Sequence, residues 1–160
     1  MLAIPIRWGA ILGIVVGATG FVFAGAGLHT NPATTAMVFV GLAIMINVAV
    51  VILGLRATAV GSSWARQLAN AGVIGVVGAV IIFASSWVMT VVVFPDYYTE
   101  MFEGYRQGFA SSGMTQDEVA TQMQAIEAST PVSSALSGAT GAIFTSLVVG
   151  ALAAVRLRQK

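Results

Sequence analysis

The sequence predicts an all-α fold: a four-helix transmembrane bundle with an extracytoplasmic, amphipathic helical hairpin between its third and fourth helices. Of the 160 residues, 58% are hydrophobic and only 8% are charged, whereas soluble domains carry about 25% charged residues. All six acidic residues lie in the segment 95–131, and the stretches on either side of it are apolar. We therefore expect residues 1–160 to form a single membrane domain, with the lipid bilayer as its first partner.

The apolar stretches predict membrane-spanning helices over residues 8–28, 35–55, 67–94 and 132–155. At about 1.5 Å per residue, each reaches across a hydrocarbon core of about 30 Å. The turn after the first helix contains Asn31-Pro32, a pair that breaks helices. His29 lies in the same turn and is expected to be an interfacial residue, since no acidic residue is near it in sequence.

Glycines recur within the predicted helices at spacings of three or four residues, which places them on one helix face. In lipid, small residues at such spacings allow helices to approach closely. An amide within hydrocarbon needs a hydrogen-bond partner, so Asn47 is expected to face another helix, although a contact with a substrate is the alternative. The residues predicted to mediate helix packing are Gly9, Gly13, Gly17, Asn47, Gly72, Gly75, Gly138 and Gly141.

The segment 95–131 is predicted to form the outer hairpin. Its first helix, from Asp96 to about Ala110, carries an aromatic and methionine face that should turn toward the bundle. Gly113 suits the end of this helix. Thr115 and Glu118 have the spacing of a capping box, in which two side chains satisfy free backbone donors at a helix start.

The acidic side chains of this hairpin are candidates for docking a partner protein. The alternatives are an ordinary solvated face, or a weak divalent-cation site at Asp96, Glu100 and Glu103. A helical row of carboxylates disfavours the cation site, because calcium prefers a folded loop that supplies six or more ligands. The predicted docking residues are Glu100, Glu103, Asp117 and Glu118.

Basic residues predict the orientation in the membrane, because arginine and lysine collect on the cytoplasmic side. In a four-helix arrangement only Arg106 falls on the side of the hairpin. Both termini and the loop 56–66 are therefore expected in the cytoplasm, and the hairpin in the periplasm. The residues on the cytoplasmic side are Arg7, Arg56, Arg66, Arg156, Arg158 and Lys160.

The layout of the second half resembles a family of bacterial integral membrane proteins called domain of unknown function 4199. The resemblance rests on Phe94-Pro95-Asp96-Tyr97-Tyr98, the Gly113-Met114 turn, Pro131 and the basic tail that follows the last helix. It extends from about Arg56 to the C-terminus and is weaker over the first two helices. The resemblance implies a membrane-embedded helical fold, and it implies no activity.

Composition also limits the chemistry. The chain has no cysteine, which excludes disulfides and thiolate metal sites. The predicted spans lack charged residues in their cores, so we expect neither an enzyme nor a bound cofactor. We expect an accessory or structural subunit of a bacterial inner-membrane assembly, such as a respiratory or photosynthetic complex, that contacts other membrane subunits or itself but no nucleic acid. The alternative is a component of an oligomeric small-solute transporter or channel.

Overall fold

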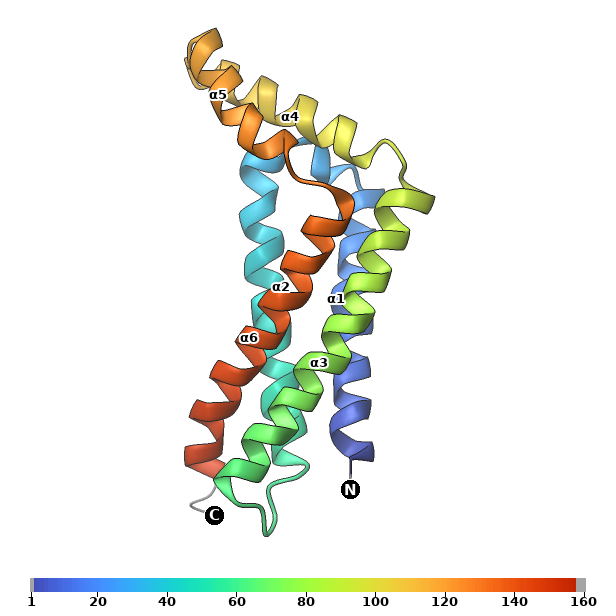
Figure 1. Cartoon of the computed structure of the whole chain (residues 1–160), viewed down its shortest axis with the longest axis vertical. Helices are drawn as coiled ribbons and strands as arrows, with labels where there is room; N and C mark the ends of the chain where they lie inside the picture. The colour runs from blue at the N-terminus through green and yellow to red at the C-terminus, as the bar shows by residue number, and fades with distance from the viewer. Residues whose placement is uncertain (1, 158–160) are drawn as a thin grey trace.

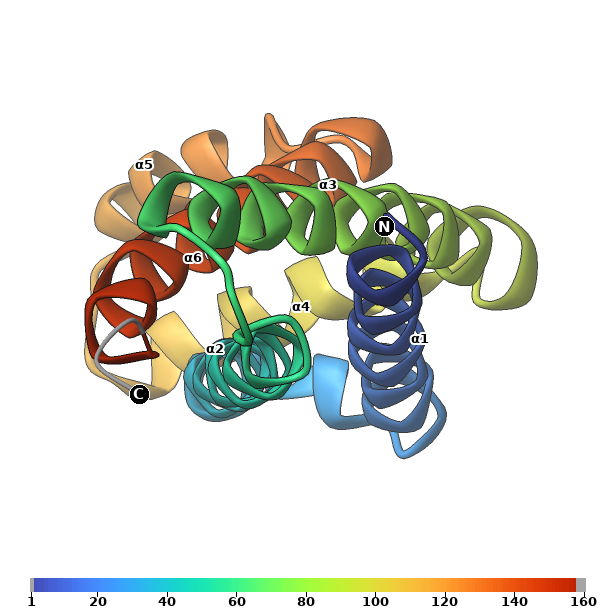
Figure 2. The same cartoon turned by 90° about the horizontal axis from the view of Figure 1, so that it is seen from below.

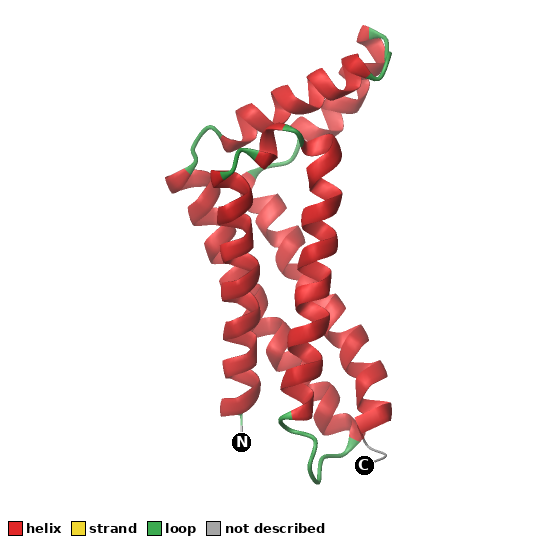
Figure 3. Ribbon diagram, turned by 180° about the vertical axis from the view of Figure 1, so that it is seen from behind, coloured by secondary structure: helices red, strands yellow, loops and turns green. Residues whose placement is uncertain are grey.

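The computed structural model describes residues 2–157, and this part of the chain is all helical, without strands (Figures 1 and 3). Four of its helices are long and apolar enough to cross a membrane. The α-helices are α1 Ala3–Gly25, α2 Pro32–Arg56, α3 Trp64–Val88, α4 Tyr97–Ser111, α5 Gln116–Glu127 and α6 Pro131–Leu157. A 3-10 turn, η1 Leu28–Thr30, follows α1, and a π-helical turn, η2 Met89–Val93, follows α3.

The four long helices lie side by side, and α3 packs against both α1 and α6 (Figure 2). On the other side of the molecule α2 contacts α1 and α6. Helix α4 crosses one end of this group, which we call the α4 end, and contacts η1 and α2 there. The N-terminus and the loop between α2 and α3 lie at the opposite end, the loop end (Figure 1).

The observed helix bounds differ from the predicted ones for local reasons. Helix α1 begins at Ala3 and includes Arg7, whose long side chain lets a charged residue occupy the end of an apolar helix. It ends at Gly25 because Gly27 takes a left-handed conformation, with φ of 69°. Helix α2 starts at Pro32, a residue favoured in the first turn because it lacks the N–H that would be unpaired there.

Polar caps extend the other two long helices beyond their apolar stretches. The Ser63 side chain accepts a hydrogen bond from the Arg66 backbone N–H, so α3 starts at Trp64 rather than at residue 67. Thr130 and Ser133 exchange side-chain hydrogen bonds with each other's backbone N–H at the start of α6. At its far end α3 widens into η2, where the Phe94 N–H reaches the Met89 carbonyl over 2.8 Å.

The segment between α3 and α6 contains α4 and α5, which contact each other. Gly113 takes a φ of 80° directly after the last residue that caps α4. Its N–H bonds to the Ala110 carbonyl and the Met114 N–H bonds to the Phe109 carbonyl, which is the Schellman pattern. The capping box of Thr115 and Glu118 is confirmed, with both reciprocal hydrogen bonds present.

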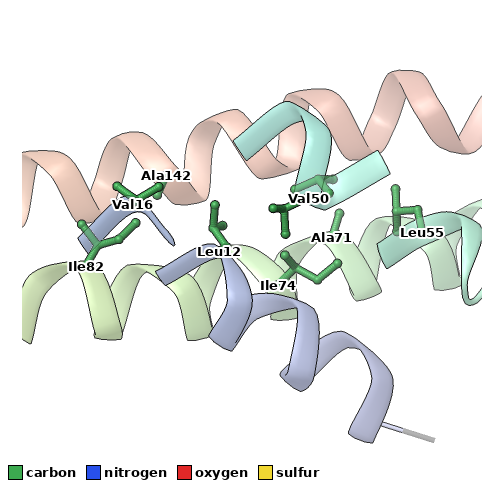
Figure 4. Packing of buried hydrophobic residues seen from close by; sticks show 9 residues of the cluster. Leu12, Val16, Val50, Leu55, Ala71, Ile74, Ile82 and Ala142 are labelled. Atoms are coloured by element: carbon green, nitrogen blue, oxygen red, sulfur yellow. The ribbon is translucent and has the colours of Figure 1, made fainter. Parts of the chain in front are cut away.

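The packed core lies in the middle and toward the loop end (Figure 4). Figure 4 shows Leu12, Val50 and Leu55 meeting Ala71 and Ile74 between the helices. Burying a side chain of this size stabilises a fold by about 1.5–3 kcal/mol in water. The half of the molecule near the loop end is therefore tightly packed, in contrast to the half near the α4 end, which is described below.

The surface of the long helices is apolar rather than charged. Large side chains are exposed on each of them, including Ile14, Met45, Val80, Phe144 and Leu152, which are 61%, 69%, 64%, 68% and 70% exposed. Water would hydrate such a surface at a high cost in free energy, whereas lipid tails would cover it. The four apolar helices are thus consistent with a multi-pass integral membrane protein.

Candidate functional site

The half of the molecule near α4 encloses a cavity of about 570 Å³. The four long helices form its wall, and α4 and η1 close it at one end. The tyrosines Tyr97, Tyr98 and Tyr105 contribute to this closure. Burial raises the pKa of the Tyr97 hydroxyl above its ordinary value, and the neighbouring Tyr98 and Tyr105 add to the shift.

His29 lies at the boundary between this cavity and α4. The residue is buried, only 8% exposed, and its Nε2 lies 2.7 Å from Oε2 of Glu100 in α4. The imidazole also stacks on the Tyr97 ring, with 4.6 Å between ring centroids. The interfacial His29 predicted above thus has a carboxylate partner 71 residues away, which its sequence neighbourhood did not reveal.

The other ring nitrogen of His29 is unusual. Nδ1 is buried and has no hydrogen-bond partner among the described residues. A buried polar atom without a partner costs about 1–3 kcal/mol. His29 therefore leaves one buried ring nitrogen unsatisfied within the described part of the chain.

Asn47 lies deeper in the same cavity wall and bridges to α6. Its side-chain N–H donates to the Ala142 carbonyl over 3.1 Å, and its Oδ1 accepts from the Ser146 hydroxyl over 3.1 Å. Asn47 is 3% exposed and Ser146 is fully buried. The amide therefore links two helices, as expected for a polar residue within a membrane span.

The predicted docking acids differ in what they contact. Glu100 is bound to His29, and Glu118 accepts hydrogen bonds from the Thr115 backbone N–H and hydroxyl, which lower the Glu118 pKa. Glu103 accepts a hydrogen bond from Gln107 and is exposed, as is Asp117.

Arg106 balances part of this negative charge. Its guanidinium pairs with Glu127 of α5 and lies 3.8 Å from Glu103. Within residues 2–157, no group of three histidine or acidic side chains lies close enough to hold a metal ion. All four predicted docking acids are exposed, and Glu100 and Glu118 in addition hold hydrogen bonds to His29 and Thr115.

The sequence of this chain matches one known protein family. Residues 7–159 match the family model described as a protein of unknown function (DUF4199). The chain belongs to the DUF4199 family. Neither a curated protein nor a solved structure matches it.

The family match extends further than the sequence resemblance suggested. It covers α1 and α2 as well as the second half, so the whole arrangement around the cavity lies within the DUF4199 region. His29, Asn47 and Glu100 all fall inside it.

Several predicted packing glycines of this DUF4199 chain lie at close helix contacts. A Cβ added to Gly9, Gly13 or Gly17 would approach atoms of α3 to between 2.4 and 2.7 Å. A Cβ on Gly75 would lie 2.9 Å from the Ser146 Cβ, and one on Gly72 would make an ordinary contact at 3.6 Å with Leu147. Helix α1 can therefore lie against α3 because these positions lack a side chain.

The prediction differs from the structure at Gly138 and Gly141. A Cβ on Gly138 would meet only Ile82, at 3.9 Å, and one on Gly141 would meet nothing within 4 Å in the described chain. Both residues line the cavity, so they leave space instead of closing a helix contact. Gly150 of α6 does lie at a close contact with α3, since a Cβ there would lie 2.3 Å from the Ala71 Cβ.

Replacing Asn47 with leucine tests the role of the amide. The variant should lose about 0.6–1 kcal/mol of stability, because interhelical hydrogen bonds in membranes contribute about 0.6 kcal/mol on average. Partner association should be unchanged. Thermal unfolding in detergent, with Asn47→Gln as the polar control, measures the first effect. Loss of partner or ligand binding in a folded Asn47→Leu protein would show instead that Asn47 is functional.

Proposed function

We propose that this DUF4199 chain is a non-catalytic accessory or structural subunit of a bacterial inner-membrane assembly, such as a respiratory or photosynthetic complex. The observation that carries the proposal is the position of α4 and α5. Their connection at residues 112–115 extends sideways beyond the four long helices (Figures 1 and 3). An element that projects from a membrane bundle is available to contact a neighbouring subunit.

The proposed arrangement in the membrane follows from charge. The four long helices form a transmembrane bundle, with α4 and α5 as a hairpin outside the hydrocarbon region. The loop end carries Arg56 and Arg66, and positive residues favour the cytoplasm. Both termini are then cytoplasmic and the hairpin is periplasmic.

The non-catalytic assignment rests on the composition of the spans. Residues 8–54, 67–94 and 132–155 contain no Asp, Glu, Lys or Arg. Catalysis within a membrane requires a positioned acid, base, nucleophile or metal. The His29–Glu100 pair lies at the α4 end, where its contacts fit a binding role.

The exposed acids of the hairpin give the docking surface its chemistry. Glu103 is 57% exposed through its side chain, and Asp117 lies in the first turn of α5 next to the projecting connection. A partner with a basic surface would complement them. The contact should weaken as salt is added, because exposed charges are screened beyond about 8–10 Å at physiological ionic strength.

The double variant Glu103→Gln, Asp117→Asn tests this role. Exposed ion pairs contribute about 0.2–1 kcal/mol each, so losing two of them should weaken partner retention about fivefold. Mild-detergent purification from native membranes, followed by quantitative mass spectrometry, measures the retention.

Asp96→Asn is the matched control, since it removes an acid at the start of α4, away from the projecting connection. Retention that falls equally in the control and the double variant would contradict docking at the tip. A wild-type chain that migrates alone, at its own mass, would contradict the subunit proposal itself.

The cavity favours a second candidate, a component of an oligomeric small-solute transporter or channel. A pathway would have to continue from the cavity through the packed layer around Leu12, Val51 and Leu55, which are fully buried. Uptake of small solutes into liposomes that contain the purified chain would favour this candidate. Liposomes that take up no small solute in the presence of the chain would favour the accessory role.

A further inference from the structure

The cavity runs along the long helices from α4 to the packed core. Val16, Ile82 and Ala142 belong to that core and also line the cavity, so they form its floor (Figure 4). The lining residues of α6 extend from Ser134 to Thr145, which at about 1.5 Å per residue is a length of about 16 Å. The cavity volume of about 570 Å³ lies within the range of about 300–1,000 Å³ that is usual for ligand sites. The cavity therefore suits a ligand that lies parallel to the helices.

The wall of this cavity favours an apolar occupant. No Asp, Glu, Lys or Arg lines it within the described part of the chain. The Asn47 amide is already hydrogen-bonded to α6 on both its nitrogen and its oxygen. Four hydroxyl groups of the wall donate their protons to backbone carbonyls, namely those of Thr35, Ser85, Thr90 and Ser137. A charged ligand would lose its hydration against this largely apolar wall, at a high cost in free energy.

The cavity reaches the surface between α2 and α6. On α2 the lining residues Val40 and Ile44 are 50% and 47% exposed, and on α6 the lining residues Ser137, Gly138 and Gly141 are exposed. The lining residues of α1 and α3 are all buried or half-buried. The two glycines carry no side chain that would obstruct the opening. The surface around it is apolar, so lipid tails would lie against it in a membrane.

A hydrocarbon chain fits this opening better than a helix of another protein does. The exposed lining residues span positions 40 to 44 of α2 and 137 to 141 of α6, or about 6 Å along each helix. A helix with its side chains is about 10–12 Å wide. Toward the loop end, the hydrogen bonds of Asn47 to Ala142 and Ser146 hold α2 and α6 together. A flexible chain can thread through such an opening, whereas a second transmembrane helix would need a groove along the whole bundle.

We propose that the cavity holds an acyl chain of a glycerophospholipid, which enters from the surrounding bilayer between α2 and α6. The headgroup stays outside in the hydrated interface, so no charged group is buried. A free fatty acid is disfavoured, because the cavity wall offers its carboxylate no Lys or Arg. The inference relies on the membrane arrangement proposed above, but not on the docking acids.

Photolabelling of the full chain in phosphatidylcholine nanodiscs tests the proposal. The probe is a phosphatidylcholine with a diazirine in the middle of one palmitoyl chain. Ile82 and Met89 of α3 line the cavity and are each only 8% exposed, so lipid outside the bundle does not reach them. Both should be labelled. Met45 and Phe144, which are 69% and 68% exposed and lie outside the cavity, report contact with the surrounding lipid.

A leucine at Gly138 should exclude the acyl chain. A Cβ on Gly138 has Ile82 as its nearest neighbour, at 3.9 Å, so the added side chain points into the cavity without a clash. Gly138→Leu should reduce labelling of Ile82 and Met89 about tenfold, a ratio equivalent to about 1.4 kcal/mol, and leave labelling of Met45 unchanged. Gly138→Ala should cause a smaller reduction and serves if the leucine variant unfolds. Gly41→Leu is the matched control, since Gly41 is open but does not line the cavity.

Native mass spectrometry of the chain released from the nanodiscs identifies the occupant. The wild-type chain should carry a phospholipid adduct that Gly138→Leu loses. Labelling of Met45 and Phe144 without Ile82 and Met89 would overturn the inference, although the chain would still be embedded in the membrane. Equal labelling of Ile82 in Gly138→Leu and Gly41→Leu would also overturn it. So would a fatty-acid adduct, or a dimer of the chain that carries no lipid.

Discussion

Replacing Gly104 with leucine is expected to detach α4 from η1 and α2. A Cβ at this position would lie 2.1 Å from the Thr30 carbonyl oxygen and 2.8 Å from Cδ of Pro32. A backbone carbonyl cannot move aside as a flexible side chain can, so α4 must shift as a whole. The contact between Glu100 and His29 would be lost with it, because both depend on the same approach of α4 to η1.

The expected loss of stability for Gly104→Leu is about 3 kcal/mol, at the upper end of the cost of overpacking a close contact. Thermal unfolding in detergent measures the total, and amide hydrogen exchange should show faster exchange in α4 than in α1. Gly41→Leu, which adds the same side chain at an open position of α2, should change little. Wild-type exchange in α4 of the Gly104→Leu variant would show that the close contact does not hold this helix.

Replacing Gly13 with leucine should separate α1 from α3. A Cβ on Gly13 would lie 2.4 Å from the Ile81 Cβ and 2.9 Å from the Gly78 carbonyl oxygen. Neither atom is at the free end of a side chain, so the two helices must move apart along their contact. We expect a loss of about 3 kcal/mol, again at the upper end for overpacking.

Resistance to denaturation in detergent reports the Gly13→Leu effect, with Gly41→Leu as the reference for leucine added to an open helix position. Amide hydrogen exchange of α1 is the second measurement, and it should be faster in Gly13→Leu than in the wild-type chain. Unchanged exchange and stability in Gly13→Leu would mean that α1 and α3 do not pack through this face.

The local features of the chain were predictable from sequence. Gly113 and the Thr115–Glu118 capping box depend only on residues a few positions away, so their spacing in the sequence is sufficient to identify them. The long apolar helices were visible for the same reason, although their ends shifted where Gly27, Pro32 and Ser63 act as caps or stops.

The site could not be predicted in the same way, because it depends on contacts between distant parts of the chain. His29 and Glu100 meet only after α4 folds back across η1. No spacing pattern marked Gly104. The position requires a glycine because the Thr30 carbonyl lies directly beside it. Gly138 and Gly141 had the spacing of packing residues, yet they face a cavity, since spacing identifies a helix face and not its neighbour.

We propose that the chain crosses the membrane four times, with α4 and α5 outside and the loop end in the cytoplasm. Because the chain has no native cysteine, a single introduced cysteine reports the side on which it lies. Val60 in the loop between α2 and α3 is 99% exposed, and Ser112 lies at the projecting connection. Both positions accept cysteine without burying it.

Labelling of intact cells with a membrane-impermeant maleimide is the most direct measurement. Val60→Cys should react only after the membrane is opened, whereas Ser112→Cys should react in intact cells once the reagent reaches the periplasm. Labelling of Val60→Cys in intact cells, or protection of Ser112→Cys until the membrane is opened, would contradict the proposed topology.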